Sequence, residues 1–227
     1  MIGIIAAMSE EMVEIKKHMK NISIEKEFEN EFFIGNIGKT ECVLTTCGIG
    51  KVNAARSTQL LICKYRPEYI INVGVAGGID NSIKIGDIVI GEKFVQYDFD
   101  LTAFGKELGE LPNNIGKYIY SDSELLNKAK RILAKLSDQK AVVGTIASGD
   151  RFVTETEKSN EINKIFGAAC VEMEGASVAH VCFLDKIPFI VIRSISDSIN
   201  DMNKIDYDKF MPIAATKAAE FIKEFLS

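Results

Sequence analysis

Short apolar runs alternate with segments of helical periodicity along the whole chain, and this alternation is the strongest constraint on its fold. Runs expected to form buried strands occupy residues 2–7, 69–73, 85–90, 141–147 and 189–195. Segments expected to be helical occupy residues 9–20, 51–65, 122–136, 175–185 and 207–226. Strands that alternate with helices pair mostly in parallel and are covered on both faces. The sequence therefore predicts an α/β fold with a mixed, mostly parallel central sheet flanked by helices.

Local signals add detail to this scheme. Two β-rich runs within residues 31–47 surround a glycine-containing turn, which predicts an antiparallel hairpin. Ser9 is expected to cap the first helix, and residues 154–157 have the spacing of a capping box that opens another. Residues 97–117 are rich in Gly, Asp and Asn, and predict a long loop of the kind that often carries function.

The composition excludes several classes of protein. The chain has 227 residues, of which 47% are hydrophobic and 26% are charged, as in an ordinary soluble globular protein. Because it contains no linker or repeat, we expect one domain over residues 1–227. A formal net charge of −5 without a long basic cluster argues against nucleic acid and anionic membranes as partners. No run approaches the ~20 apolar residues of a membrane span.

Cysteine and histidine usage argues against a metal or redox site. The chain has 5 cysteines, an odd number without a CxxC pair, and 2 histidines, which cannot build a typical metal cluster. Free thiols of this kind are typical of a reducing compartment, so we expect a cytoplasmic protein without a metal.

Two carboxylates stand where apolar runs give way to polar residues. Glu174 follows the run that ends at Val171, and Asp197 follows the run of residues 189–195. In open α/β sheets, such strand ends are where ligands bind. Two acids at one crevice suggest acid-assisted cleavage of a bond between a sugar and its leaving group. On local sequence alone, either acid could instead be a structural cap.

Three other features lie next to comparable strand ends. Glu11 is in the first turn of the first helix, where an acid can also simply complement the helix dipole. Residues 74–78 form a glycine-rich segment that could let the backbone approach a ligand or could be a tight turn. Arg193 lies within an apolar run and requires an anionic partner, so a structural ion pair is its alternative role.

Taken together, these segments resemble one family. The matching motifs occur in order at residues 3–11, 74–78, 101–105, 148–150, 171–174 and 194–197. They resemble the bacterial 5′-methylthioadenosine/S-adenosylhomocysteine nucleosidases of the nucleoside phosphorylase superfamily, over essentially the whole chain. The resemblance implies a three-layer Rossmann-like sandwich that forms a homodimer. It also implies hydrolysis of an N-glycosidic bond, releasing adenine and a 5′-thioribose product for methionine salvage, with no cofactor.

The same resemblance implies roles for the polar residues. Asp197 would be the general acid that protonates the purine at N7, and Glu174 would hold the ribose hydroxyls. Glu11 would orient and activate the attacking water. Arg193 and Ser196 would support the water and Asp197.

Pocket walls and a subunit contact are implied as well. The backbone of Val153 would read the adenine edge, and Phe152 would stack on the base. The residues expected around the substrate and its 5′ substituent are Met8, Ile49, Met173 and Tyr207. The residues expected to reach into the partner subunit's site are Leu101, Phe104 and Pro112.

One position departs from the family pattern. Val75 stands where the family usually has a hydroxyl residue that is associated with the water network. Backbone groups of Ala76 and Gly77 are expected to serve in its place.

The chemistry explains why one residue type would take different roles. Adenine is a poor leaving group as an anion, so Asp197 must hold a proton that it can donate, and burial would raise its pKa accordingly. Glu174 is expected to remain ionised, because a carboxylate stabilises the positive charge that develops on the ribose. Glu11 is expected to be an anion that serves as the base.

Two alternative functions differ in class or in nucleophile. A purine nucleoside phosphorylase would need positive charge around phosphate, whereas Glu10 and Glu11 follow the first strand and no Lys or Arg precedes Lys16. This favours water as the nucleophile. A sensor that binds adenosine derivatives without catalysis is disfavoured by the presence of all three acids.

The sequence does not rank methylthioadenosine, adenosylhomocysteine, 5′-deoxyadenosine and aminofutalosine-type nucleosides, which differ at the 5′ end.

Overall fold

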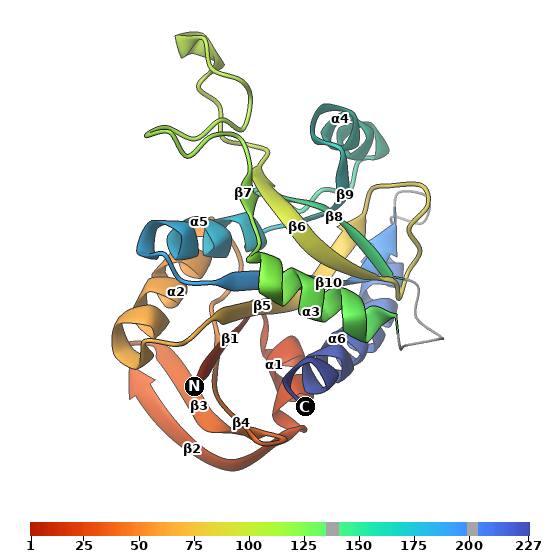
Figure 1. Cartoon of the computed structure of the whole chain (residues 1–227). Coiled ribbons are helices and arrows are strands. Elements are labelled where there is room, and N and C mark those ends of the chain that lie inside the picture. Colours follow the sequence, from red (N-terminus) through yellow and green to blue (C-terminus); the bar gives the residue numbers. More distant parts are fainter. Residues whose placement is uncertain (135–140, 199–203) are drawn as a thin grey trace.

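One mixed β-sheet forms the centre of the molecule, and helices cover its two faces (Figure 1). A computed structural model describes residues 1–134, 141–198 and 204–227, with the backbone alone described at residues 198 and 204–208. The strand order is β10-β6-β8-β9-β5-β1-β4-β3-β2, while β10 also pairs with β5 and β7 pairs with β6. In chain order the elements are β1 (Ile2–Ala6), α1 (Ser9–Lys16), β2 (Met19–Glu27), β3 (Asn30–Ile37), β4 (Thr40–Thr46), α2 (Lys51–Tyr65), β5 (Ile70–Gly78), β6 (Ile88–Gln96), the 3₁₀ turn η1 (Thr102–Phe104), β7 (Ile119–Tyr120), α3 (Ser123–Leu133), β8 (Ala141–Ser148), α4 (Thr156–Phe166), β9 (Ala168–Glu172), α5 (Gly175–Asp185), β10 (Phe189–Ser198) and α6 (Lys204–Leu226).

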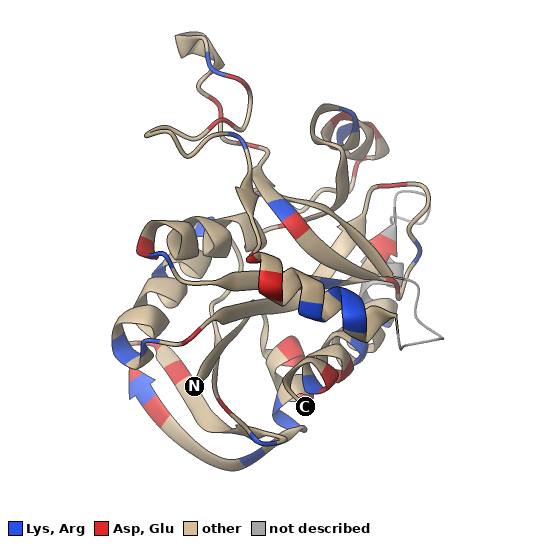
Figure 2. Cartoon of the chain, viewed as in Figure 1, with Lys and Arg blue, Asp and Glu red and all other residues tan. Residues whose placement is uncertain are grey.

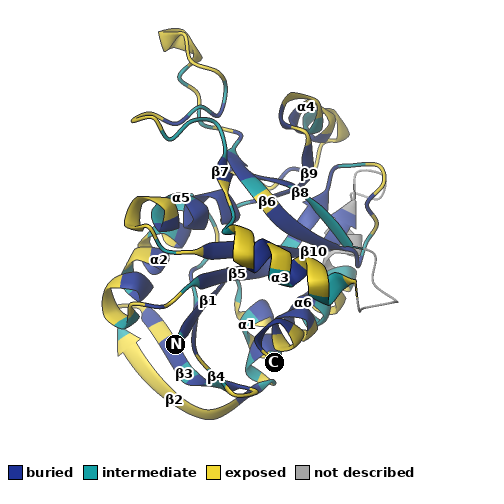
Figure 3. Cartoon of the chain, in the orientation of Figure 1, coloured by how far each residue is buried: buried dark blue, intermediate teal, exposed yellow. Residues whose placement is uncertain are grey.

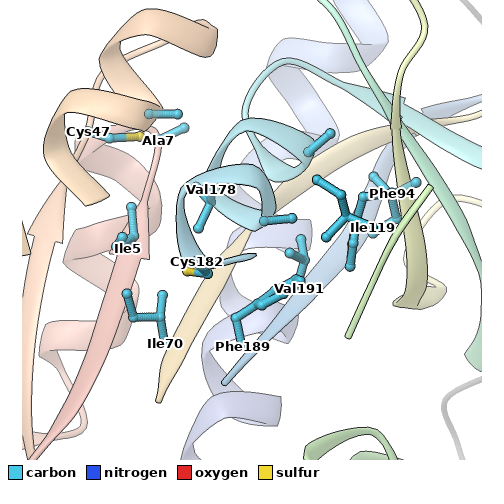
Figure 4. Packing of buried hydrophobic residues seen from close by; sticks show 14 of the residues in the cluster. Ile5, Ala7, Cys47, Ile70, Phe94, Ile119, Val178, Cys182, Phe189 and Val191 are labelled. Carbon is cyan, nitrogen blue, oxygen red and sulfur yellow. The ribbon is translucent and has the colours of Figure 1, made fainter. Parts of the chain in front are cut away.

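Strands β1, β5 and β10 each contribute to two hydrophobic clusters, one on each face of the sheet. Along β10, Ile190 and Ile192 pack with residues of α3 and α6, whereas Phe189 and Val191 pack with residues of α2 and α5. Successive side chains of a strand point to opposite faces of the sheet, so neighbouring residues of β10 enter different clusters. Figure 4 shows the second cluster, with Val178 of α5 beside the strands. Figure 3 shows that β1, β5 and β9 are buried along almost their whole length. The three layers confirm the predicted α/β sandwich.

Several predicted elements match the structure closely. The hairpin of β3 and β4 turns at Gly38, whose φ is 61°, with Ile37 paired to Thr40. Helix α2 ends at a left-handed Arg66 just before Pro67. The long loop lies between β6 and β7 and extends away from the rest of the chain (Figure 1). None of the helices in the described ranges is both long and apolar enough to cross a bilayer.

Other predicted boundaries were wrong. The first helix ends at Lys16, not near residue 20, because Met19 begins strand β2 at the edge of the sheet. This strand was not predicted, since almost all its side chains are exposed and no apolar face alternates with a polar one (Figure 3). The strand predicted at residues 69–73 continues through the glycines to Gly78, and β9 was not predicted with bounds.

The predicted helix caps also differ from those observed. Met8, not Ser9, is the N-cap of α1, and the carboxylate of Glu11 accepts a hydrogen bond from the Met8 amide. The capping box predicted at residues 154–157 does not form: α4 begins at Thr156, and its N-cap Glu155 makes no side-chain capping bond. The last two residues of the helix predicted at 122–136 lie outside the described residues.

The sheet topology explains where the site lies. Strands β1, β5 and β10 run in parallel, so their carboxyl ends lie at one edge of the sheet. Strand β9 runs antiparallel to β5 and pairs with the carboxyl end of β5, where Val171 lies opposite Gly77. Ser196 is an extra residue in β10, because Ile195 pairs with Ala76 and Asp197 with Gly77. Such a bulge changes the direction of the side chain beside it.

Candidate active site

One pocket at these strand ends gathers most of the residues that the sequence singled out. Eleven of them line it: Met8, Glu11, Ile49, Ala76, Gly77, Phe152, Val153, Met173, Glu174, Ser196 and Asp197. They come from six separate parts of the chain, so the fold brings together motifs that the sequence shows only as separate segments. Val75, Arg151 and Glu172, which had no predicted role as lining residues, also face the pocket.

Five predicted site residues do not line this pocket. Arg193 lies beneath it, with 1% of its surface exposed. Leu101, Phe104 and Pro112 lie in or next to the extended loop between β6 and β7, and Phe104 is 81% exposed. The side chain of Tyr207 lies outside the described residues.

Three backbone amides hold the carboxylate of Glu11. Its Oε2 accepts hydrogen bonds of 2.9 Å from the amides of Ala7 and Met8, and its Oε1 accepts one of 3.0 Å from the amide of Val75. The side chain therefore joins the end of β1 to the middle of β5, and it is only 3% exposed. Each carboxylate oxygen can accept two hydrogen bonds, so Oε1 retains an acceptor position for a further donor.

Asp197 lies across the pocket and is also buried. The hydroxyl of Ser196 donates a 2.7 Å hydrogen bond to its Oδ1. Its Oδ2 faces the backbone of Gly77, where a Cβ atom would be 2.9 Å away. Ser196 and the glycine together determine the direction of this carboxyl group.

Glu174 is the N-cap of α5, and its side chain points to a third segment of the chain. Its Oε1 accepts a 2.9 Å hydrogen bond from the amide of Gly50, at the start of α2. Gly50 has a φ of 98°, a conformation that favours glycine. Asp150 holds the same turn by accepting a 2.7 Å hydrogen bond from the amide of Lys51.

Arg193 has a partner that the sequence did not identify. Its guanidinium bonds to Oε2 of Glu172 at 2.5 Å and to Oδ1 of Asn72 at 2.6 Å. The alternative of a structural ion pair with a nearby acid thus has a specific partner in Glu172. Sequence reasoning had one signal for it: a buried arginine requires an anion, and Glu172 lies within the same motif as Glu174.

The glycine-rich segment has a role that was not predicted. Residues 74–78 continue strand β5 and do not form a turn. A Cβ atom at Gly74 would lie 2.8 Å from Oε1 of Glu11, just as one at Gly77 would crowd Asp197. These two glycines therefore make room for two carboxylates, because any larger residue would displace them.

Known proteins match this chain over its whole length. A family model described as the Phosphorylase superfamily matches residues 1–227. A 5′-methylthioadenosine/S-adenosylhomocysteine nucleosidase from Marinomonas sp. is 38% identical over 226 residues, which cover 99% of this chain and 97% of the relative. The chain belongs to this nucleosidase family of the phosphorylase superfamily.

Solved structures of two similar proteins show the same fold. The nucleosidase from Neisseria meningitidis in complex with methylthio-immucillin-A has a TM-score of 0.94 and 34% identity, with 99% of this chain and 97% of that chain covered. A futalosine hydrolase from Helicobacter pylori has a TM-score of 0.93 and 33% identity, with 99% and 96% covered. The nucleosidase-family fold predicted from the sequence is confirmed.

The departure at position 75 has a structural explanation in this member of the nucleosidase family. The group at this position that contacts Glu11 is the amide of Val75, not its side chain. Every residue except proline supplies that amide. The backbone amide of residue 75 therefore holds Glu11, whether the side chain of residue 75 is that of valine or carries a hydroxyl group.

Burial shifts the pKa values of all three acids upward in this nucleosidase-family site. The pKa of Asp197 is raised by burial, although the hydrogen bond from Ser196 lowers it in part. Burial likewise raises the pKa of Glu11 against its amide hydrogen bonds and the charge of Arg193. The pKa of Glu174 is raised to about 7, by burial and then by the neighbouring charge of Glu172. Glu174 was expected to be ionised, but this pKa leaves its two protonation states close in free energy at pH 7.

The raised pKa of Glu174 predicts a specific dependence of stability on pH. A carboxyl with a pKa of about 7 in the folded protein binds its proton more tightly than the unfolded chain does, where the value is near 4.5. Its contribution to the free energy of unfolding therefore falls as pH rises through that window. We expect the melting temperature of the wild type, relative to Glu174→Gln, to fall across it. A constant difference between the two proteins would contradict the raised pKa.

Proposed function

We propose that the protein hydrolyses the N-glycosidic bond of 5′-methylthioadenosine and S-adenosylhomocysteine, releasing adenine and the 5′-thioribose product. The observation that carries this proposal is the meeting of Glu11, Glu174 and Asp197 in one pocket of a nucleosidase-family chain. A similar structure contains methylthio-immucillin-A, which supports an adenine nucleoside as the ligand. Such an enzyme would serve methionine salvage and the recycling of adenosylhomocysteine.

Asp197 serves as the general acid in this proposal. Burial raises the pKa of Asp197, which favours the protonated carboxyl group that donates to N7 of the purine as the bond to the sugar lengthens. Ser196 donates to Oδ1, so the proton for the purine is carried by Oδ2. The bare backbone of Gly77 keeps this oxygen free of contact with a side chain at that position.

Glu11 and Glu174 act on the other side of the scissile bond. The remaining acceptor position on Oε1 of Glu11 accepts a proton from the attacking water. Glu174 is bound through Oε1 to the Gly50 amide, which leaves Oε2 to accept hydrogen bonds from the ribose hydroxyls. The positive charge that develops on the sugar favours the ionised forms of Glu11 and Glu174. The interactions of Glu11 with the water and of Glu174 with the ribose hydroxyls are therefore stronger in the transition state than in the ground state.

The remaining walls of the pocket fit a purine and an apolar 5′ group. Phe152 is half exposed at the pocket, where it stacks on the base, and the backbone of Val153 reads the adenine edge. Apolar contacts to the 5′ substituent come from Met8, Ile49 and Met173. Backbone groups of Ala76 and Gly77 face the same space.

The charge distribution supports water over phosphate as the nucleophile. Among the described residues that line or underlie the pocket, both arginines are paired with acids, Arg193 with Glu172 and Arg151 with Glu155. Three further carboxylates stand around the reaction centre. Phosphate requires unpaired positive charge, whereas a neutral water molecule does not. Across the rest of the surface, acidic and basic residues are interspersed (Figure 2).

A homodimer is part of the same proposal. Leu101, Phe104 and Pro112 do not line the pocket of their own chain and lie on or beside a loop that extends away from it (Figure 1). Large exposed apolar side chains also occur on α2 and α5, at Val52 and Leu184. These exposed apolar side chains are candidates for burial in an interface. The loop of one subunit would then complete the pocket of its partner.

Mixed dimers test this arrangement. Phe104→Ser and Asp197→Asn, each poorly active alone, are expected to regain activity when co-expressed and purified through two different tags. The hybrid has one site with an intact Asp197 and an intact Phe104 from the other subunit, so about half of its sites work. A hybrid no more active than its parents would rule out a shared site.

Substrate preference is the part of the function that the 5′ side of the pocket determines. Methylthioadenosine, adenosylhomocysteine and 5′-deoxyadenosine share adenine and ribose, so the three acids treat them alike. A futalosine hydrolase among the similar structures makes aminofutalosine-type nucleosides a second candidate class. Turnover of the four compounds side by side, measured as adenine released, tests the proposal. Adenine release from none of them would overturn it, and tight binding without turnover would indicate a sensor.

We also propose a cytoplasmic location. All five cysteines are free, and four of them are buried. Free thiols are maintained in reducing compartments. Fractionation of the source cells with detection of the protein in the soluble cytoplasmic fraction would test this.

A further inference from the structure

We propose that Glu172 is a positioning residue for the hydrolytic reaction, holding both Arg193 and Glu174 in the arrangement that the transition state requires. This inference rests on the proposed function. The sequence assigned Glu172 no role, yet its carboxylate has more partners than any acid described above. The residue is 7% exposed, ends strand β9 and is one of the residues that line the pocket.

One carboxylate oxygen of Glu172 connects two parts of the site. Its Oε2 accepts hydrogen bonds from Nε and Nη2 of Arg193, at 3.2 and 2.5 Å. The same oxygen accepts from the amides of Glu174 and Gly175, at 3.1 and 2.7 Å. Those amides form the N-terminus of α5, so Glu172 caps the helix whose N-cap is Glu174. A shift of the Glu172 carboxylate would therefore move both Arg193 and Glu174.

Ser148 fixes the other oxygen of Glu172. The two residues are paired at the ends of β8 and β9, and the hydroxyl of Ser148 donates to Oε1 of Glu172. The same hydroxyl accepts a 2.7 Å hydrogen bond from the amide of Ala176, the next free amide of α5. Ser148 and Glu172 thus satisfy three successive amides at this helix N-terminus. The hydroxyl of Ser148 has one hydrogen to donate, and Glu172 receives it.

Gly175 shows how closely this arrangement is packed. A Cβ atom at this position would lie 3.2 Å from both carboxylate oxygens of Glu172 and from Val191. This distance is shorter than ordinary van der Waals contact, so a larger residue would displace the carboxylate. Gly175 therefore leaves the space that the Glu172 carboxylate occupies.

Charge explains why this position matters for the rate. Arg193 is fully buried, and its remaining partners, Asn72 and the carbonyl of Ile192, are neutral. Its charge acts on both Glu11 and Glu174. Without the charge of Glu172, this cation would oppose the positive charge that develops on the ribose. A neutral ground-state substrate would be affected far less, so kcat should fall while KM changes little.

A double-mutant cycle tests the proposal with methylthioadenosine as substrate. Glu172→Gln is expected to lower kcat by about 10²-fold, as misplacement of a site by about 1 Å does, with KM almost unchanged. Glu161→Gln, which removes a surface ion pair with Lys158, is the matched control and should keep full activity. In an Arg193→Gln background, Glu172→Gln should have a smaller effect, because the part of its role that acts through Arg193 is already lost and only the part that acts through Glu174 remains. Full additivity, or an unchanged kcat in folded Glu172→Gln, would overturn the proposal.

Two further measurements separate the possible failures. If Glu172→Gln does not fold, Ser148→Ala removes only the neutral hydroxyl contact and should lower kcat by about tenfold, at the lower end of effects of supporting hydrogen bonds. A folded Ser148→Ala with wild-type kcat would overturn the proposal. Wild-type protein that releases no adenine would count against the proposed function instead. The crystal structure of Ser148→Ala then decides: displaced Glu172, Arg193 or Glu174 side chains support the proposal, and unmoved ones overturn it.

Discussion

Replacing Asp197 with asparagine is expected to lower kcat for methylthioadenosine by about 10²–10⁴-fold, the range of general acid catalysis. The reason is specific to the proton. Asparagine has nearly the same shape and can still accept the hydrogen bond from Ser196, but it has no acidic proton to donate to N7 of the purine. Because the substitution removes a buried carboxyl whose pKa is raised, the folded protein should be at least as stable as the wild type.

The measurement is steady-state kinetics with release of adenine as the readout, together with a thermal melt. Asp185→Asn is the matched control, because Asp185 is an exposed acid that accepts a hydrogen bond from Gln59 far from the pocket. That variant should retain wild-type kcat. Near-normal turnover by a folded Asp197→Asn variant would remove Asp197 from the acid role.

Glu11→Gln should reduce kcat by a comparable factor of about 10²–10⁴. Glutamine can still accept amide hydrogen bonds through its one carbonyl oxygen, but its amide nitrogen cannot. One of the two groups of donors, from Ala7 and Met8 or from Val75, therefore loses its acceptor. The variant also lacks a base for the attacking water. KM should rise less than kcat falls, since the substrate does not depend on Glu11 for binding.

The adjacent residue provides an internal control for Glu11. Glu10 is next in the helix but exposed, and it accepts a hydrogen bond from the hydroxyl of Ser9. Glu10→Gln should therefore behave as the wild type. Val75→Thr should also keep its activity, because the amide at this position holds Glu11. If Glu11→Gln kept full activity, the assignment of Glu11 to water activation would be wrong.

Much of the site could be predicted from the sequence because its acids stand at strand ends. Glu174 and Asp197 each follow an apolar run, and ligands of open α/β sheets bind at such strand ends. The sequence did not show that β9, which precedes Glu174, is antiparallel to β5 and meets its carboxyl end. The bulge at Ser196 could not be predicted, since nothing in the local sequence shows that one residue of β10 is left out of the pairing with β5. Yet this bulge contributes to the direction of Asp197.

Glu172 could not be assigned a role for a related reason. Its partners Arg193, Ser148 and Asn72 come from three other strands, and only tertiary pairing brings them together. The edge strand β2 was missed because most of its side chains are exposed, which leaves no alternation of apolar and polar residues to recognise. Strands β1 and β10 were found, because they are buried on both faces and begin with continuous apolar runs.

The most direct test of the account is whether the enzyme needs phosphate. The initial rate of adenine release from methylthioadenosine is measured without phosphate and in excess phosphate, and the sugar product is examined by ³¹P NMR. If water is the nucleophile, the two rates should be equal and no sugar phosphate should form. Adenine release that requires phosphate and yields a ribose 1-phosphate would contradict the account.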